Sequence, residues 1–254
     1  MPVGRLSRPD GHEIAFRRQR GRSPGIVFFG GFNSTMTGVK ANWLAERCRE
    51  GGRAFLRFDG FGHGESTGLL ADGTVGRWRE DALAVVDSLT DGPQVLVGSS
   101  MGVWIAVLVA LARPARIAGL IGIAGAPDFT REVIRPTLST EAKAALARDG
   151  VWHRPSAYDP DPYPIARRAL EEAEAHLILS RRLALDFPVR LLHGTADPDV
   201  PYALSLRLAQ AIDGPDVAVT LIPGGDHRLS TDADLAILGC VIDQVLVSAT
   251  RPSR

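Results

Sequence analysis

The chain has 254 residues, a length that suits one large α/β domain because sheets flanked by helices reach this size without splitting. Hydrophobic residues make up 45% of the chain and charged residues 23%, a composition that excludes an intrinsically disordered protein. The 29 Lys and Arg residues balance 29 Asp and Glu residues, so the charge does not favour nucleic acid as a partner and suits a small neutral substrate.

The first quarter of the chain alternates short β-rich runs with a helical stretch, which is typical of a mostly parallel sheet covered on both faces. We predict strands over 12–19, Gly25–Phe29 and Arg53–Phe58, and a helix near 38–50. The next stretch, Asp59–Ser66, is too rich in glycine for regular structure and is predicted to be a loop.

The same alternation continues to the C-terminus, with one long interruption. Apolar residues from Trp78 to Leu89 recur at helical spacing. The further elements that we predict are strands over Val95–Val97, Ile117–Ala124, Val189–Leu192 and Val217–Ile222, and helices over Val103–Ala112, near 202–212 and over 232–247.

The interruption covers residues 127–187. It is rich in proline, contains helical stretches such as Glu141–Arg148, and has no convincing strand. Insertions of this length inside a domain are usually lids rather than idle loops. We therefore predict one domain over residues 1–254 with a helical cap over about 127–187.

The stretch Gly98-Ser99-Ser100-Met101-Gly102 is the motif G-x-S-x-G, with a hydrophobic strand before it and an apolar helix after it. In a nucleophile elbow the serine occupies a strained strand-to-helix turn that exposes its hydroxyl. The helix N-terminus also places free N–H groups near an oxyanion. The alternative is a Gly/Ser turn without chemistry, which the strand and helix context disfavours.

A serine hydroxyl needs a base to take its proton and an acid to orient that base. In folds that carry a nucleophile elbow on a mostly parallel sheet, the chain order is serine, acid, histidine. The acid and the histidine lie on loops that follow late strands. Asp197 and His227 meet both conditions, so we predict a catalytic triad of Ser100, Asp197 and His227.

Other acids and histidines compete with these two. Asp199 shares a loop with Asp197 and Asp226 precedes His227, and for Asp199 a structural or capping role is the default. Asp59 also follows a strand, and we interpret it as a turn residue that organises the glycine-rich loop. The remaining histidines lie at positions that suit structural roles: His12, His63, His153, His176 and His193.

The backbone N–H groups of Phe32 and Met101 are the predicted oxyanion hole, because one donor should follow the first buried parallel strand and the other should follow the nucleophile. Trp152, Tyr158 and Tyr163 are weak candidates for substrate contacts from the cap. No metal motif, cysteine cluster or Walker loop is visible, so we expect no metal and no cofactor.

The compartment is predicted from three negative signals. Cys48 and Cys240 form no C-x-x-C pair, the opening residues lack the apolar stretch of a signal peptide, and Asp10 and Glu13 weigh against a transit peptide. The apolar runs are too short to span a bilayer. We expect a cytoplasmic protein without a stable membrane anchor, and the sequence does not indicate an oligomeric state.

The chain resembles the α/β-hydrolase superfamily over nearly its whole length, and within it the branch of mitochondrial acyl-protein thioesterases, also known as mycophenolic acid acyl-glucuronide esterases. The segments that carry the resemblance are Lys40 onward and the ranges 57–59, 76–81, 91–94, 97–102, 150–152, 190–194 and 226–228. The resemblance implies an α/β-hydrolase fold and hydrolysis of S-acylated cysteine or of acyl esters by Ser100, Asp197 and His227. One departure is Val103, where the family usually has glycine.

Three functions stay open. The first is a serine hydrolase of acyl thioesters or esters, with an acylated protein as a possible partner, acting through an acyl-enzyme. The second is a generalist carboxylesterase on small oxygen esters, including acyl glucuronides. The third is a ligand-binding relative without turnover, which the complete triad disfavours. Dehalogenases and epoxide hydrolases need a carboxylate where this chain has Ser100.

Overall fold

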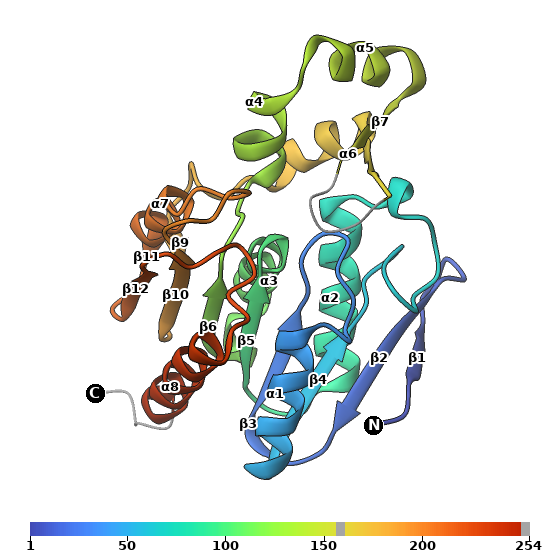
Figure 1. Cartoon of the computed structure of the whole chain (residues 1–254). Helices are drawn as coiled ribbons and strands as arrows, with labels where there is room; N and C mark the ends of the chain where they lie inside the picture. The colour runs from blue at the N-terminus through green and yellow to red at the C-terminus, as the bar shows by residue number, and fades with distance from the viewer. Residues whose placement is uncertain (156–160, 250–254) are drawn as a thin grey trace.

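The computed structural model describes residues 1–155 and 161–249, and a single eight-stranded sheet runs through it in the order β1-β2-β4-β3-β5-β6-β10-β12 (Figure 1). All neighbours from β4 to β12 pair in parallel, whereas β1 with β2 and β2 with β4 pair antiparallel. The predicted mostly parallel sheet is thereby confirmed. Its strands are β1 (Gly4–Ser7), β2 (Glu13–Gln19), β3 (Arg22–Phe29), β4 (Arg53–Phe58), β5 (Gln94–Ser99), β6 (Ile117–Ile123), β10 (Val189–Gly194) and β12 (Val217–Ile222).

Helices cover both faces of the sheet because successive strand residues point to opposite sides. On β3, Ile26 and Phe28 pack with α1 (Val39–Glu50) and α8 (Asp232–Ala249). Val27 and Phe29 belong to the second core cluster, on the other face. The helices of that face are α2 (Val75–Leu89), α3 (Met101–Ala112) and α7 (Ala203–Ala211).

Helix α3 is buried along almost its whole length, from Met101 to Ala110. A helix that is apolar all round must be covered all round. The sheet covers one side of it and α2 packs against another. The long insertion reaches it too, because the indole Nε1 of Trp104 donates a hydrogen bond of 2.9 Å to the carbonyl of His176.

Much of the described part of the insertion lies beyond the carboxyl ends of the central strands, where Figure 1 shows α4, α5, α6 and β7. Helix α5 has Ser139 as its N-cap, which accepts from Ala142 N, and Gly150 in the left-handed region as its C-cap. The elements of the insertion are a π-helical turn (Thr130–Ile134), α4 (Arg135–Thr137), α5 (Thr140–Asp149), β7 (Val151–Arg154), β8 (Tyr163–Ala166), α6 (Arg167–Glu172), a 3₁₀ turn (Ala173–His176) and β9 (Leu183–Ala184), which lies beside α7 (Figure 1).

The prediction of no strand in this insertion was wrong. Strands β7 and β8 pair antiparallel with Trp152 opposite Ile165, and β9 pairs with β11 (Ile212–Asp213). These strands have four residues or fewer, too few for an alternation of apolar and polar residues to stand out. Pro164 in β8 also lowers the strand signal, since proline cannot donate to a ladder.

Candidate active site

Ser100 lies in a sharp turn between β5 and α3, with φ 55° and ψ −122°. A serine in the left-handed half of conformational space is strained, so the surroundings must hold it there. Two backbone hydrogen bonds do so, because Ser100 N donates to Ile123 O at 2.9 Å and Ser100 O accepts from Ala126 N at 3.1 Å.

The two motif glycines are required by close backbone approach. A Cβ atom on Gly98 would lie 2.6 Å from the carbonyl oxygen of Gly102. A Cβ atom on Gly102 would collide with the carbonyls of Phe29 and Gly30 at the end of β3. Because only glycine lacks this atom, the motif lets the end of β3 pack directly against the start of α3.

The three predicted triad residues lie together, each on a loop at the carboxyl end of its strand. His227 Nε2 lies 3.1 Å from Ser100 Oγ, and His227 Nδ1 lies 2.8 Å from Asp197 Oδ2. The Asp197 side chain is 1% exposed and that of His227 17%, so the acid is sheltered while the base reaches the cavity. With the serine donating to Nε2 and Nδ1–H donating to the carboxylate, the chain of contacts is set for proton transfer.

Asp197 is held as an anion by four donors. Its Oδ1 accepts from the backbone N–H groups of Asp199 and Val200, both at 2.9 Å. Burial raises the pKa of Asp197, but hydrogen bonds from His193 and His227 outweigh it and hold the pKa well below its usual range. The backbone N–H of Asp199 therefore supports the acid.

His193 is a functional contact that sequence reasoning did not find. Its Nε2 lies 3.1 Å from Asp197 Oδ2 and 3.0 Å from the carbonyl of Val200, and both of these atoms only accept, so Nε2 carries the proton. In the neutral ring, Nδ1 then accepts from Ser205 Oγ at 2.7 Å. The signal in the sequence is its place four residues before Asp197 at the end of a strand.

The rival acids have other partners. Asp226 Oδ1 accepts from Leu229 N at 2.9 Å and thereby shapes its own loop. Asp59 accepts from Glu65 N within the glycine-rich loop, as expected, and also from Met36 N outside it. Asp199 lines the cavity.

A cavity of about 330 Å³ opens in front of Ser100. Tyr163 lines this cavity, whereas Trp152 packs against the hydrophobic core and is absent from the lining, and Tyr158 is outside the described residues. The side chains that line the cavity come from the oxyanion loop, the elbow, the insertion and the two triad loops: Phe32, Ser100, Met101, Phe129, Val133, Arg154, Tyr163, Asp199 and His227 are among them.

Both predicted oxyanion residues border the cavity. The loop that carries Phe32 lies close to the nucleophile, since a Cβ atom on Gly31 would lie 3.1 Å from Ser100 Cβ. Met101 is the first residue of α3, where N–H groups have no partner within the helix. Their role as hydrogen-bond donors to an oxyanion stays a prediction.

Three cationic side chains also line the cavity: Lys40, Arg154 and Arg228. The Lys40 amine donates to the carbonyl of Arg228 and lies 3.3 Å from Ser230 Oγ, so it ties α1 to the loop of the triad histidine. Burial lowers the pKa of Lys40 to about 8.

Among the described residues, Asp197, Asp199 and His227 have potential metal-ligand atoms within 4.8 Å of one another. The carboxylate of Asp197 already accepts four hydrogen bonds, so this group fits a triad better than a metal site. None of the helices in residues 1–155 and 161–249 combines the length and apolar character needed to cross a membrane.

Comparison with known proteins gives concordant matches. Residues 23–160 match the family model described as "Serine aminopeptidase, S33". The chain is 42% identical over 242 residues to a mouse protein named "Palmitoyl-protein thioesterase ABHD10, mitochondrial", covering 95% of this chain and 81% of that protein. For the human protein of the same name the identity is 40%, with 95% and 79% covered.

Solved structures agree with these matches. Alpha/beta hydrolase domain-containing protein 10 from mouse superimposes with a TM-score of 0.89 at 40% identity, over 97% of this chain and 98% of that one. A putative hydrolase from Agrobacterium vitis superimposes with a TM-score of 0.91 at 36% identity, over 96% and 99%. These likenesses confirm the α/β-hydrolase fold.

The prediction of a cytoplasmic protein is contradicted by the same relatives, because the mammalian proteins are named as mitochondrial. That prediction depended on the cysteine spacing, the composition of the opening residues and the shortness of the apolar runs. Acidic residues such as Asp10 and Glu13 are a weak signal, since a compartment is read by receptors from a short segment and not from the fold.

Proposed function

The chain belongs to the serine aminopeptidase family of α/β-hydrolases, and from this premise we propose that it cleaves acyl thioesters and acyl esters with a Ser100–His227–Asp197 triad. Membership makes it a hydrolase. The observation that supports the triad is the pair of hydrogen bonds made by His227, 3.1 Å to Ser100 Oγ and 2.8 Å to Asp197 Oδ2.

The first half of the proposed reaction forms an acyl-enzyme. Ser100 Oγ attacks the carbonyl carbon while His227 Nε2 takes the hydroxyl proton, and the resulting imidazolium is stabilised by Asp197. The oxyanion accepts hydrogen bonds from the backbone N–H groups of Phe32 and Met101. The thiol or alcohol then leaves with the proton from His227.

The second half releases the acid. Water enters the place of the leaving group, His227 takes a proton from it, and the hydroxide attacks the acyl carbon. Collapse of the second tetrahedral intermediate breaks the acyl bond to Ser100 Oγ, which takes the proton from His227, and the acid leaves. The contacts from His193, Asp199 and Val200 to Asp197 keep the acid anionic throughout, so His227 is oriented in both halves.

We infer an acylated substrate and assign the selection of its acyl chain to residues 127–187, which act as a cap. Two apolar side chains of this segment, Phe129 and Val133, border the cavity. The mammalian relatives are named for palmitoyl-protein substrates, and an S-acylated protein is the partner that this likeness favours. A buried methylene contributes ~0.8 kcal/mol, so apolar lining favours longer chains.

A second candidate is hydrolysis of acyl glucuronides, as part of a broader carboxylesterase activity. The observation that favours it is the set of cations in the cavity, Lys40, Arg154 and Arg228, which suits a substrate that carries a carboxylate. An acyl glucuronide supplies both an ester and that carboxylate.

The test is a turnover screen with purified protein across acyl chain lengths, using matched thioesters and oxygen esters. Ser100→Ala should lower the rate by roughly 10⁴-fold or more and abolish labelling by a fluorophosphonate probe. Thioesters should react faster, because a thiol with a pKa near ~8.5 is a better leaving group than an alcohol. Equal turnover by Ser100→Ala and wild type would overturn the triad, and no turnover by either protein would favour a non-catalytic binding protein.

A further inference from the structure

The glycine-rich loop Asp59–Ser66 holds the oxyanion loop, residues 30–38, at two points. Met36 N donates to Asp59 Oδ1 at 2.6 Å. Asn33 N donates to His63 Nε2 at 3.1 Å. The proposed reaction uses neither Asp59 nor His63, although both are buried polar side chains close to its site.

The contacts of His63 fix its protonation. Its Nδ1 lies 3.1 Å from the carbonyl oxygen of Phe61, which only accepts, so Nδ1 carries the proton. Its Nε2 faces the backbone N–H of Asn33, which only donates, so Nε2 carries the lone pair. His63 is 7% exposed, and burial lowers its pKa, which favours the neutral ring that this arrangement needs.

The hydrogen bond to Asn33 controls a strained backbone position. Asn33 has φ 55°, in the left-handed region, and it directly follows Phe32. The surrounding structure must fix such a residue, since the strain costs on the order of 1–3 kcal/mol. The same loop lies close to the nucleophile at Gly31, where a Cβ atom would be 3.1 Å from Ser100 Cβ, so a shift at Asn33 would move backbone beside the site.

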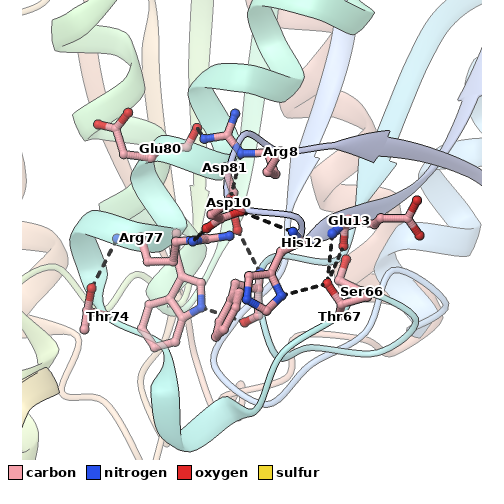
Figure 2. Close-up of polar contacts among 12 residues, drawn as sticks. Arg8, Asp10, His12, Glu13, Ser66, Thr67, Thr74, Arg77, Glu80 and Asp81 are labelled. Carbon is pink, nitrogen blue, oxygen red and sulfur yellow. Dashed lines mark hydrogen bonds and ion pairs between the residues drawn. The ribbon is translucent and has the colours of Figure 1, made fainter.

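The glycine-rich loop can hold the oxyanion loop in place because hydrogen bonds bind the glycine-rich loop to helix α2. Asp81 Oδ2 accepts from Phe61 N at 2.9 Å, and Trp78 Nε1 donates to the Phe61 carbonyl at 3.0 Å. Asp81 is buried on α2 between Arg8 and Arg77 (Figure 2), and the Nε atom of each arginine lies 3.3 Å from its Oδ1. Helix α2 therefore fixes Phe61, whose carbonyl in turn fixes the His63 ring.

The loop is also attached to β2 at its other end. Thr67 Oγ1 accepts from Glu13 N at 2.8 Å and lies 3.1 Å from His12 Nδ1 (Figure 2). Ser66 Oγ accepts from Ala15 N at 2.8 Å. With α2 on one side and β2 on the other, the loop is a rigid support for the His63 ring.

We propose that His63 is a positioning residue for the oxyanion hole, whose neutral ring accepts the N–H of Asn33 and thereby aims the N–H of Phe32 at the oxyanion. The inference rests on the proposed function. Because the oxyanion exists only after attack, a misplaced donor weakens transition-state binding and leaves substrate binding nearly unchanged.

Two amide variants distinguish the contributions of the two ring nitrogens, because each variant keeps a polar atom near the position of one nitrogen. In His63→Gln the amide oxygen reaches the place of Nε2 and can accept from Asn33 N. In His63→Asn the shorter amide matches Nδ1, so it keeps the contact with the Phe61 carbonyl and loses the contact with Asn33. Val245→Ala serves as a stability control, since Val245 is buried on α8 in the other core cluster.

The measurement is kcat and KM for p-nitrophenyl butyrate, with the melting temperature of each variant. We expect His63→Asn to lower kcat about 10- to 100-fold with KM within about twofold, because a donor misplaced by ~1 Å costs up to ~10²-fold. His63→Gln should regain most of the loss. Val245→Ala should lower the melting temperature without lowering kcat.

The outcomes distinguish this inference from the proposed function. Wild-type activity no higher than that of Ser100→Ala would remove the proposed function itself. Active wild type with equal kcat in His63→Asn would overturn the role of His63. A kcat that falls equally in the Asn and Gln variants, in step with the melting temperature, would also overturn it, since the role would be structural.

Discussion

At the scale of single residues, Asp197 is the acid on which the site converges. It accepts from two histidines and two backbone N–H groups, and its side chain is 1% exposed. A carboxylate with all its lone pairs engaged cannot turn away from His227 without leaving donors unpaired. The fold therefore fixes the orientation of the His227 ring, which is the base in the proposed mechanism.

This predicts unequal effects of two neighbouring changes. Asp197→Asn should lower kcat/KM by roughly 10⁴-fold, because an amide holds the imidazole in the wrong tautomer. Asp199→Asn should leave most activity, since Asp199 supports Asp197 through its backbone N–H. Steady-state kinetics on one ester is the measurement, with Ser100→Ala as the blank. The opposite ranking would move the role of the acid to Asp199.

Lys40 gives a prediction for stability against pH. Its pKa is about 8 in the folded chain against an ordinary 10.5, so between these values the unfolded chain binds more protons and stability rises with pH. As the pH rises through this window, the free energy of unfolding of wild type should increase relative to that of Lys40→Met. The increase should be at most ~1.4 kcal/mol per pH unit. Urea titrations across the window measure it. A difference independent of pH would show that Lys40 titrates normally.

At the scale of elements, the proposed function assigns contact with the acyl chain to the insertion. Val133 lies in its π-helical turn and borders the cavity. Val133→Trp should fill the space and lower kcat/KM for the longest acyl esters first, while acetyl esters react at nearly the wild-type rate. Val133→Ala is the matched control, and it should extend the range of chain lengths. An equal loss for all chain lengths would mean that this turn does not contact the acyl group.

The elements differ in how far the sequence predicts them, for a physical reason. Strand β3 can be recognised in the sequence as a run of large apolar residues, because both of its faces are buried. The hairpin β7–β8 has one face against the core and only four residues a strand, so its pattern is too short to recognise. That is why Trp152 was predicted as a substrate contact although it packs against the core.

The residues of the candidate site also differ in how far the sequence predicts them. Ser100, Asp197 and His227 are predictable because their positions relative to strands follow from the fold. His63 is not, because its role depends on Asn33, a partner that no spacing rule connects to it. For His193 the sequence offers only its place four residues before Asp197, and nothing in the spacing predicts its contact with Ser205. The sequence does not distinguish a histidine whose ring nitrogen accepts a hydrogen bond near the site from a histidine with a purely structural role.

At the scale of the whole molecule, the equal numbers of acidic and basic residues set the colloidal behaviour. With a formal net charge of 0 at pH 7, the chain should be least soluble near neutral pH. Precipitation by polyethylene glycol across a pH series measures this. A minimum displaced by several pH units would mean that shifted pKa values, and not composition, govern the net charge.

The contact between His227 and Ser100 joins positions 127 residues apart in the chain, and Asp197 lies 30 residues before His227. Loops of this length close late, because chain entropy opposes them until the intervening strands are in register. During refolding from denaturant, helical circular dichroism should therefore recover first and fluorophosphonate reactivity last. The reactivity of Ser100 towards a fluorophosphonate would then report the final step of folding, in which the three loops meet, whereas circular dichroism would report the earlier formation of helices.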